Sequence, residues 1–439
     1  MHSLSDLQAG KLIGAKELRI TNAGLCEFPN ELFDLSETLE ILDLSGNHLS
    51  ALPEDFPRLK KLRVLFVSNN EFEVVPTILA ECPALSMVGF KANRITTLAE
   101  NALPKDIRWL ILTDNKIKTL PISMGQHIQL QKLMLAGNQI SALPVEMENC
   151  KKLELLRISA NNFKTLPEWL FQLPRLAWLA FAGNPCSEKK EIPTSLPEVH
   201  WHELELGERI GEGASGLISK AFWKQDSEVA VKEFKGSVTS DGYPTDEMSA
   251  AMHMGEHPNL IEVIGRIASH PEQKEGLLLS LISDDFSNLA EPPCLDSCTR
   301  DCYGEGQSFS LLQVLNIAEA ISSAAMHLHE RGLMHGDLYG HNILINSSAE
   351  CLLGDFGAAS HYHPLNLDIN AVVEKIEVRA FSCLLEELLA RIKEHEVAIY
   401  DEIILKLHAL QESCHSENNS DRPVFSDIYS TLSTLKNLS

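Results

Sequence analysis

Residues 39–53 have the sequence LEILDLSGNHLSALP, and residues 62–76 repeat the pattern as LRVLFVSNNEFEVVP. In both copies an aliphatic residue occupies the first, fourth and sixth positions, and asparagine occupies the ninth. A fixed spacing of this kind indicates a repeat array, in which each unit buries its apolar face only against its neighbours. The asparagine recurs at intervals of 22 or 23 residues, in the series Asn47, Asn70, Asn93, Asn115, Asn138, Asn161 and Asn184.

The pattern matches that of leucine-rich repeats, which each contribute one short strand to a parallel sheet. We expect the leading leucines to point into the solenoid and the asparagine to hydrogen-bond backbone groups that no strand ladder satisfies. A degenerate earlier copy, from Leu18 to Pro29, carries Ala23 in the asparagine position, as is common in a terminal repeat. The sequence therefore predicts an α/β solenoid of about eight repeats over residues 1–184. A linking or capping segment, 185–200, follows it.

Alternation along each short strand places the third and fifth positions of the repeat on the outward, concave face. Most of these positions are apolar, which is typical of a surface that binds a protein partner. The alternative is that the same surface packs against the C-terminal part of the chain. Six side chains define what we call the concave stripe: Phe66, Met87, Trp109, Ile111, Met134 and Trp178.

The composition is that of an ordinary globular protein, but the charge is unevenly spread. Hydrophobic residues make up 44% and charged residues 22% of the chain, which excludes collagen-like and disordered classes. Residues 201–439 contain 16 Lys and Arg against 38 Asp and Glu, and so carry −22 of the total charge of −24. Such a surface repels phosphate backbones and anionic headgroups, so we expect no nucleic-acid or membrane partner, whereas a basic protein partner or substrate is plausible.

The ten cysteines and the start of the chain bear on the cellular compartment. The first residues lack a basic segment followed by an apolar one, and scattered cysteines in a long chain favour reduced thiols, so we expect a cytoplasmic protein. Cys294, Cys298 and Cys302 recur every four residues. Because no fourth ligand lies close by, we favour ordinary thiols there over a structural zinc site.

The second half of the chain begins with a glycine-rich segment between two predicted strands. Gly211-Glu-Gly213-Ala-Ser-Gly216 follows one strand pattern, and the next strand ends in Val229-Ala-Val-Lys232. The glycine pattern alone is weak evidence, because it also opens helices that bind dinucleotides. In the order strand, glycine turn, strand, lysine, it predicts a hairpin that covers nucleotide phosphates with its backbone amides and supplies them with a positive charge.

Two further motifs follow in the order that the same chemistry requires. They are His335-Gly-Asp337, with Asn342 downstream, and Asp355-Phe-Gly357. With these four motifs, residues 201–439 resemble a eukaryotic-type protein kinase domain, and the whole chain resembles the leucine-rich repeat-containing protein kinase family. The resemblance implies an α+β bilobal domain that binds ATP and Mg²⁺ between a small sheet-rich lobe and a larger helical lobe.

The resemblance also assigns roles to individual residues. Asp337 corresponds to the base that accepts the proton of the acceptor hydroxyl, and Asn342 and Asp355 correspond to the Mg²⁺ ligands. Lys232 corresponds to the lysine that binds the phosphates, with Glu247 as its partner on the following helix. The ATP contacts that the resemblance implies are Gly211, Glu212, Gly213, Ala214, Ser215, Gly216, Ile218, Ala230, Lys232 and Glu247, with Leu279–Ile282 as the hinge that receives adenine.

Several positions depart from the family pattern. Gly336 stands where an arginine usually precedes the catalytic aspartate, and Tyr339 stands where serine/threonine kinases commonly have lysine. Only 22 residues separate Asp355 from Glu377, the position that resembles the aspartate opening the next buried helix. The chain has no Ala-Pro-Glu motif, so we expect a short peptide-docking segment and a late structural arginine, Arg422, without its usual glutamate partner.

Three functions are compatible with these observations. The favoured hypothesis is an ATP-dependent protein kinase of the serine/threonine type, directed to a protein by its repeats. A small-molecule phosphotransferase would explain the His-Gly-Asp spelling and the short segment, but it would not need eight repeats. A catalytically silent nucleotide-binding scaffold is the third, and intact Lys232, Asp337, Asn342 and Asp355 argue against it.

Overall fold

The computed structural model describes residues 2–187, 196–213, 215–224, 227–236, 238–362 and 367–438, with the side chains of all but 367–371. The chain divides into two compact units, Met1–Leu173 and Pro174–Ser439. This division falls ahead of the predicted boundary after residue 184. The strand of the eighth repeat, β8 (Trp178–Ala180), therefore belongs to the second unit.

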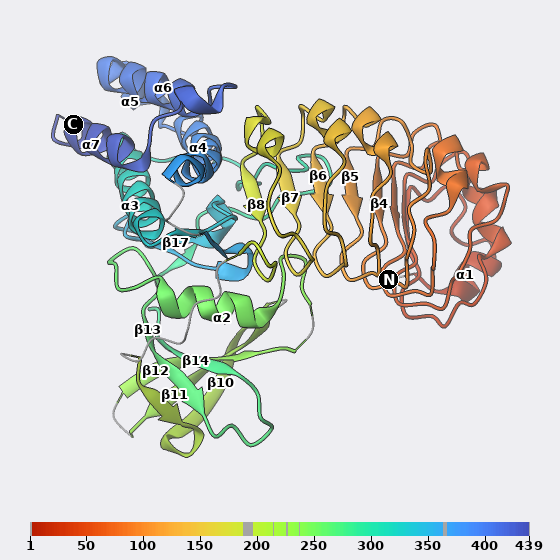
Figure 1. Cartoon of the computed structure of the whole chain (residues 1–439), viewed down its shortest axis with the longest axis horizontal. Coiled ribbons are helices and arrows are strands. Elements are labelled where there is room, and N and C mark those ends of the chain that lie inside the picture. The colour runs from red at the N-terminus through yellow and green to blue at the C-terminus, as the bar shows by residue number, and fades with distance from the viewer. Residues whose placement is uncertain are drawn as a thin grey trace. The chain divides into compact units, whose positions relative to one another are not determined.

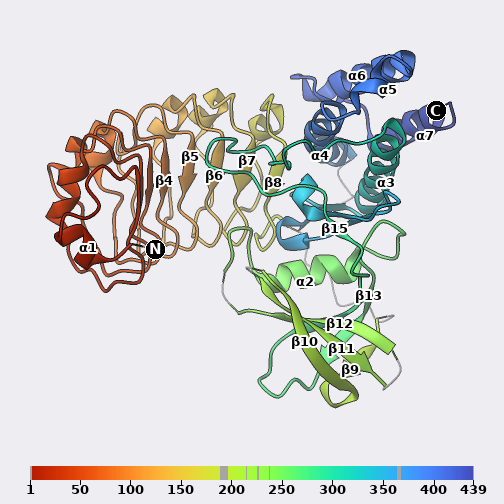
Figure 2. The ribbon, with the colours of Figure 1, turned by 180° about the vertical axis from the view of Figure 1, so that it is seen from behind.

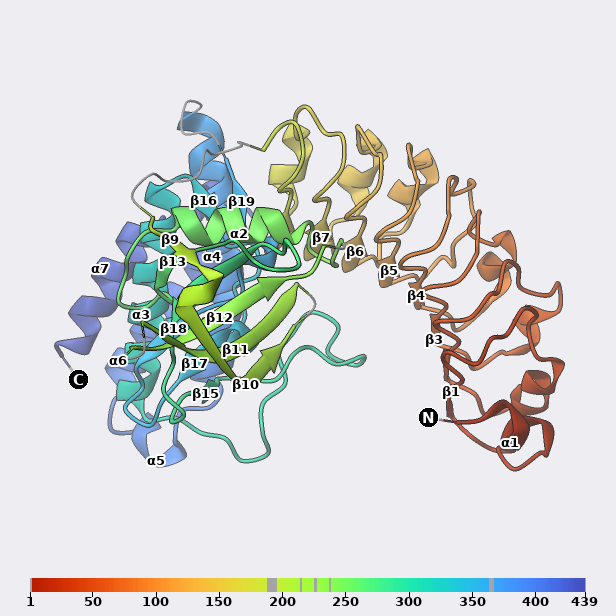
Figure 3. The same cartoon turned by 90° about the horizontal axis from the view of Figure 1, so that it is seen from below.

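The first unit is a solenoid whose strands line one side and whose short helices line the other (Figures 1 and 3). Helix α1 (Leu4–Gln8) begins it. The parallel strands are β1 (Glu17–Arg19), β2 (Ile41–Asp43), β3 (Val64–Phe66), β4 (Met87–Gly89), β5 (Trp109–Ile111), β6 (Lys132–Met134) and β7 (Leu155–Arg157). The 3-10 helices are η1 (Asn30–Leu35), η2 (Phe56–Arg58), η3 (Thr77–Glu81), η4 (Ile122–Gln126), η5 (Val145–Asn149) and η6 (Glu168–Gln172).

The register of the parallel strands confirms the predicted repeat. Leu42 pairs with Leu65, and the equivalent central residues of the following strands stay aligned and fully buried. The regular spacing of the asparagines along the chain has the predicted structural cause. The Asn115 amide nitrogen donates to the Phe90 and Leu112 carbonyls at 2.9 and 3.1 Å, and its oxygen accepts from the Ile95 amide at 2.9 Å. Each such side chain thus satisfies buried backbone groups of adjacent turns.

The second unit opens with a six-stranded sheet (Figure 2). Its spatial order is β10 (Leu204–Glu212), β11 (Gly216–Trp223), β12 (Ser227–Phe234), β14 (Gly276–Ser280), β13 (Val263–Ala268) and β9 (Glu198–His200). Strand β9 pairs in parallel with β13, Val199 opposite Ile267, and both side chains are buried. The predicted linker 185–200 is therefore wrong at its end, because its last residues complete the sheet.

The rest of the second unit is mainly helical, and the sheet and the helices gather at its two ends (Figure 2). The helices are α2 (Pro244–His253), α3 (Leu311–Glu330), α4 (Leu367–Leu389), α5 (Glu394–Val397), α6 (Asp401–Cys414) and α7 (Phe425–Lys436), with 3-10 turns η7 (Trp201–Glu203), η8 (Gly340–Asn342), η9 (Phe356–Ala358) and η10 (Asn419–Asp421). Two small sheets join β15 (Ser287–Asn288), β17 (Ile343–Ile345) and β18 (Cys351–Leu353), and β16 (Leu333–Met334) with β19 (Ser360–His361).

Two of these helices form the framework of the site. Helix α2 packs Met248 and Met252 against Phe234 and Leu277 of the large sheet. Helix α3 begins at a capping box, in which Ser310 and Gln313 bond each other's backbone amides. Among the described helices, α3 alone is long and apolar enough to cross a membrane, but 56% of its apolar window is buried within the protein, as in a core helix.

The asparagine contacts generate a stability prediction. Asn115→Ala leaves the Ile95 amide and two carbonyls buried without their partner, so the first unit should lose about 2 kcal/mol or more. The urea midpoint of the first unit measures this. Asn149→Ala, at an exposed position on η5, is the matched control and should change little. Equal stability of the two variants would contradict the structural role of the asparagine series.

Candidate active site

The glycine hairpin between β10 and β11 covers a cavity of about 190 Å³. Its turn closes through a 3.0 Å hydrogen bond from the Gly213 amide to the Gly216 carbonyl. A Cβ on Gly216 would lie 2.5 Å from the Glu233 carbonyl oxygen and 3.5 Å from the Lys232 side chain, so only glycine fits there. The cavity is lined by Gly213, Ser215, Gly216, Ile218, Lys232, Thr239, Asp241, Asp355 and Gly357.

Five of the predicted ATP contacts, Gly213, Ser215, Gly216, Ile218 and Lys232, line this cavity. Of the others, Ala230 is buried in β12 opposite Leu279 of the predicted hinge, and Glu212 pairs with Lys235 at 2.9 Å rather than lining the cavity. Gly211 lies within β10, and Ala214 falls outside the described residues.

The wall of the cavity contains a buried ion pair. Lys232 of β12 pairs with Glu247 of α2, and their side chains are 15% and 4% exposed. Burial raises the pKa of the Glu247 carboxyl, while Lys232 acts in the opposite direction and Asp355 adds to the rise. The pairing is the one predicted from the sequence. It fixes the lysine ammonium group at the wall of the cavity that Asp355 also lines.

The catalytic loop, residues 335–342, holds Asp337 from two sides. The Asn342 amide donates at 2.9 Å both to the Asp337 carboxylate and to the Asp337 carbonyl. The His335 ring donates to the Gly354 carbonyl at 2.9 Å and meets the Phe356 ring edge-on at 5.0 Å between centroids. The motif that carries Asp337 and the motif that carries Asp355 are therefore joined by direct contact.

Glu377 of α4 anchors the backbone of this loop. Its carboxylate accepts hydrogen bonds from the amides of His335 at 3.2 Å and Gly336 at 2.7 Å, and from the ring of His329 at 2.8 Å. Glu377 is fully buried, so these donors replace all of its hydration. Glu377 was expected to open the helix, but it lies in the middle of α4 (Leu367–Leu389).

The absence of an arginine at position 336 has a steric cause. Gly336 has a φ of +75°, in the left-handed region that favours glycine. A Cβ there would lie 2.7 Å from the Ala358 carbonyl oxygen and 2.7 Å from the Leu179 carbonyl oxygen. No other residue type fits without moving one of these backbones.

Trp178, predicted as an outward-facing partner contact, is instead buried and only 1% exposed. Its indole stacks on the Tyr339 ring, with 4.2 Å between centroids and 5° between planes, and its Nε1 donates to the Leu338 carbonyl at 3.1 Å. For this residue the alternative of packing against the same chain is correct. The stack also engages Tyr339, one of the residues that depart from the pattern of the resemblance.

The rest of the concave stripe is less uniform than predicted. Met87 and Met134 are buried, whereas Phe66, Trp109 and Ile111 remain partly exposed. Trp109 and Phe66 form an edge-to-face pair at 6.3 Å. The partly exposed surface of the stripe is therefore aromatic at its centre.

Arg422, expected to lack its usual glutamate partner, is buried and hydrogen-bonded to backbone. It donates to the carbonyls of Ser416, Lys375 and Pro174 at 2.9, 2.8 and 2.9 Å. Burial lowers the pKa of its guanidinium group to about 10. Carbonyl oxygens, one of them from the eighth repeat, thus take the place of the missing glutamate.

The donor atoms fit a Mg²⁺ ion bound together with phosphates. The Asn342 amide nitrogen is used on Asp337, so its oxygen is the atom available to a metal, and Asp355 adds an exposed carboxylate at the cavity. Magnesium in phosphoryl-transfer sites typically takes one or two such oxygens and completes its shell with phosphate and water. Asn342 and Asp355 are the residues that would hold it.

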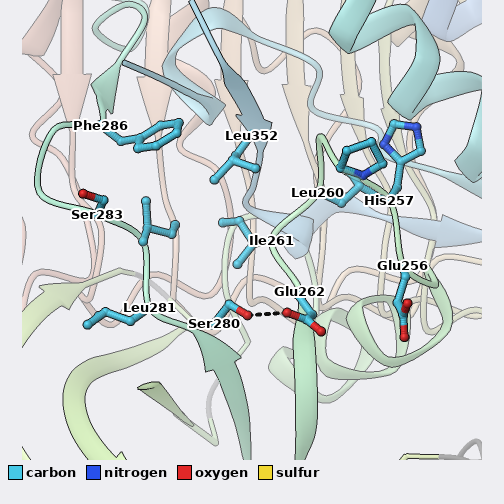
Figure 4. Close-up of a pocket in the computed structure, with 12 residues that line it drawn as sticks. Glu256, His257, Leu260, Ile261, Glu262, Ser280, Leu281, Ser283, Phe286 and Leu352 are labelled. Atoms are coloured by element: carbon cyan, nitrogen blue, oxygen red, sulfur yellow. Dashed lines mark hydrogen bonds between the residues drawn. The ribbon is translucent and has the colours of Figure 1, made fainter. Parts of the chain in front are cut away.

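A larger cavity, about 630 Å³, lies elsewhere in this unit (Figure 4). It is lined by residues 256–258 and 260–262 after α2, by residues 280–283 around the predicted hinge, and by Phe286 and Leu352. In Figure 4 the Ser280 hydroxyl donates to the Glu262 carboxylate. None of the predicted catalytic residues lines this cavity, so size alone does not locate the chemistry.

Two residues that line the cavity under the glycine hairpin were missed by sequence reasoning. Thr239 and Asp241 lie in the segment between β12 and α2, where the Thr239 hydroxyl donates to the Gly242 carbonyl at 3.1 Å and accepts from the Asp241 amide at 3.2 Å. The run Thr-Ser-Asp-Gly reads as an ordinary turn. Nothing in the sequence of this turn indicates that it reaches the cavity.

Both parts of the chain match known family models. Residues 204–380 match a family model described as a protein kinase domain, and residues 38–59 and 128–185 match models described as leucine-rich repeats. Mouse cyclin-dependent kinase 11B is 26% identical over 222 residues, which cover 49% of this chain and 26% of that protein.

Two further relatives show the same partial coverage. The Drosophila melanogaster serine/threonine-protein kinase PITSLRE is 26% identical over 186 residues, or 40% of this chain and 19% of that protein. Human ephrin type-B receptor 4 is 31% identical over 166 residues, which cover 36% of this chain and 15% of that protein. The chain thus spans about a quarter or less of the length of these three relatives.

The contacts of Glu377 predict a pH dependence. Burial acts most strongly and raises the pKa of its carboxyl, but the hydrogen bond and charge of His329, the charge of His335 and the Gly336 amide together hold that pKa below its ordinary value of 4.5. A carboxyl whose pKa is lowered by folding stabilises the folded state above its unfolded pKa. This stabilisation is lost as the pH falls below about 4.5.

Glu377→Gln should therefore lower the urea midpoint of the second unit at neutral pH, and should flatten its change between about pH 5 and about pH 3. Glu412→Gln, at an exposed position on α6, is the control and should follow the wild type. A Glu377→Gln profile parallel to the wild-type profile would refute the assignment.

Proposed function

We propose, since the chain joins leucine-rich repeats to a protein kinase domain, that it transfers the γ-phosphate of ATP to a hydroxyl group of a protein. The observation that carries this proposal is the shared cavity, in which Lys232, paired with Glu247, faces Asp355 beneath the glycine hairpin. Asp337 is held next to that motif by Asn342 and by the contact of His335 with Phe356. This is the arrangement that phosphoryl transfer requires, because the reaction depends on position and charge.

Each residue of the chain then has a defined task. The amides of the glycine hairpin and the Lys232 ammonium group bind the nucleotide phosphates. The Asp337 carboxylate, oriented by Asn342, accepts the proton of the attacking hydroxyl. Asn342 and Asp355 would hold Mg²⁺, which neutralises charge on the phosphates when bound.

We place the acceptor among serine and threonine side chains. Support comes from PITSLRE, a relative whose name states serine/threonine specificity, although the similarity also reaches a receptor, ephrin type-B receptor 4. We also place the protein in the cytoplasm. The ten cysteines are scattered through a long chain, a usage that favours reduced thiols and a reducing compartment.

The proposed activity is tested by transfer of labelled γ-phosphate from ATP to proteins of a cell lysate. Asp337→Asn should bind ATP nearly as well as the wild type and transfer phosphate slower by orders of magnitude, because it removes the base and leaves the phosphate cavity intact. Asp427→Asn, at an exposed position on α7, is the matched control and should transfer at the wild-type rate.

The outcome also decides between the alternatives. Equally slow turnover by wild type and Asp337→Asn would refute catalysis and leave a nucleotide-binding scaffold. Label in small metabolites but not in proteins would instead indicate a small-molecule phosphotransferase.

We further propose that the partly exposed part of the concave stripe binds the protein partner. Phe66 on β3 and Trp109 and Ile111 on β5 belong to the same sheet, with β4 between the two strands. The Lys132 ammonium lies 4.4 Å from the centre of the Trp109 ring. Leucine-rich repeats are generally protein-interaction modules, and a rigid aromatic residue is a common centre of such an interface. The charge of −22 on residues 201–439 favours a partner with a basic segment.

Loss of this aromatic centre should separate partner binding from chemistry. Trp109→Ala should reduce phosphate transfer into the lysate protein that the wild type labels most strongly. The expected reduction is about thirtyfold, equivalent to a loss of about 2 kcal/mol of binding free energy. Its rate on a short generic peptide should be unchanged, because the peptide does not need the repeats. Ile122→Ala, which removes a side chain that is 62% exposed on η4, is the control. A parallel fall on protein and peptide would contradict a recruiting role.

A further inference from the structure

We propose that the eighth repeat is part of the catalytic unit, and that Trp178 is a positioning residue that holds the catalytic loop in place. The inference rests on the kinase activity proposed above and adds the element that orders its site. Three observations carry it: the contacts of Trp178 with the loop, the contacts of the residues after its strand with the segment after Asp355, and the features of a kinase domain that this chain lacks.

The contacts of Trp178 fall on the residues immediately after Asp337. Its ring lies flat on Tyr339 at 4.2 Å, and its Nε1 donates to the Leu338 carbonyl at 3.1 Å. The two rings are only 1% and 4% exposed, so the stack is a desolvated core contact. Stacking of this kind and a buried hydrogen bond both resist displacement of the loop.

The backbone of β8 bounds the residue immediately before Asp337. A Cβ added to Gly336 would lie 2.7 Å from the Leu179 carbonyl oxygen. The strand and the loop therefore approach each other as closely as a glycine allows. Asp337 is thus fixed through Gly336 on one side and through Leu338 and Tyr339 on the other. Asp337 itself remains partly exposed, so the repeat supports the loop and leaves the carboxylate accessible.

Residues that follow β8 hold the segment after the proposed metal-binding motif. The Phe181 amide donates to the Ser360 hydroxyl at 2.9 Å, and the Ser187 hydroxyl donates to the His361 carbonyl at 3.0 Å. Ser360 and His361 form β19, which pairs with β16 just ahead of the catalytic loop. One repeat therefore fastens both chain segments that surround the site.

These contacts involve Gly336 and Tyr339, two of the residues that depart from the kinase pattern. An arginine before the catalytic aspartate normally pairs with a phosphate on the activation loop and orders it. Gly336 has no side chain to do so, and Glu377 follows Asp355 after only 22 residues. The eighth repeat supplies permanent packing instead. The bond from Arg422 to the Pro174 carbonyl at 2.9 Å ties the start of this repeat to the helical lobe.

The full-length chain tests this positioning role through steady-state kinetics. Trp178→Ala should lower kcat by about tenfold or more and leave the KM for ATP within about twofold, because Lys232 and Glu247 are not touched by the stack. Trp178→Phe keeps an aromatic ring but loses the Nε1 donor. Its kcat should therefore lie between that of the wild type and that of Trp178→Ala. Trp169→Ala, at a half-buried position on η6, is the matched tryptophan control and should keep the wild-type kcat.

A double-mutant comparison isolates the stack. Once Tyr339→Ala has removed the ring partner, adding Trp178→Ala should cause little further loss of kcat. Additive losses would show that Trp178 acts through contacts other than the ring of Tyr339. An unchanged or raised kcat in Trp178→Ala would overturn the proposal, and a raised kcat would show that the repeat inhibits.

Amide hydrogen exchange provides a readout that needs no activity. In Trp178→Ala, exchange at residues 336–342 and 358–361 should accelerate by about tenfold or more, while β10 to β12 stay as protected as in the wild type. Should Trp178→Ala fail to fold, Trp178→Phe decides by the same pattern at smaller amplitude. Unchanged exchange in these segments would refute the inference even if the kinase is active. A wild type that transfers no phosphate, with exchange altered as expected, would refute the proposed function alone.

Discussion

The buried carboxylate of Glu377 accepts the backbone amides of His335 and Gly336, and the conformation of the catalytic loop follows from this interaction. Amides buried without a partner cost about 1–3 kcal/mol each, so the loop cannot leave the carboxylate without a replacement. The ring of His329, which lies in α3, donates a hydrogen bond to the same carboxylate. Glu377 therefore connects the loop to α3. Because α3 and α4 form the framework of the helical lobe, the position of Asp337 is set by the core.

The left-handed conformation of Gly336 links this anchor to the repeats. With φ at +75° and no side chain, the backbone there can approach the Leu179 carbonyl closely. A residue that reads as a lost arginine is therefore also a site of close packing. The same packing places Trp178 over Tyr339, so two departures from the kinase pattern share one physical cause.

Sequence reasoning succeeded where a residue's role is local or periodic. The asparagine ladder follows from the repeat length, and the pairing of Lys232 with Glu247 follows from the order of the motifs. It failed for Trp178, because strand alternation predicts which face a side chain is on, but not what covers that face. It also could not place Thr239 in the cavity, since a turn sequence carries no information about distant neighbours.

The two compact units also do not follow the repeat periodicity. Repeat periodicity ends at Asn184, but compactness depends on contacts such as that between Phe181 and Ser360, which join distant parts of the sequence. Likewise, Val199 lies in a segment with the composition of a linker, yet it pairs with β13 and is fully buried. Such non-local pairings cannot be derived from local propensity alone.

The most direct test of the account is a crystal structure of the full-length chain with Mg²⁺ and a non-hydrolysable ATP analogue. We expect the phosphates in the cavity lined by Lys232 and Asp355, the metal on Asn342 and Asp355, and Trp178 still stacked on Tyr339. Nucleotide bound elsewhere, or a bound complex in which Trp178 has left Tyr339, would contradict the account.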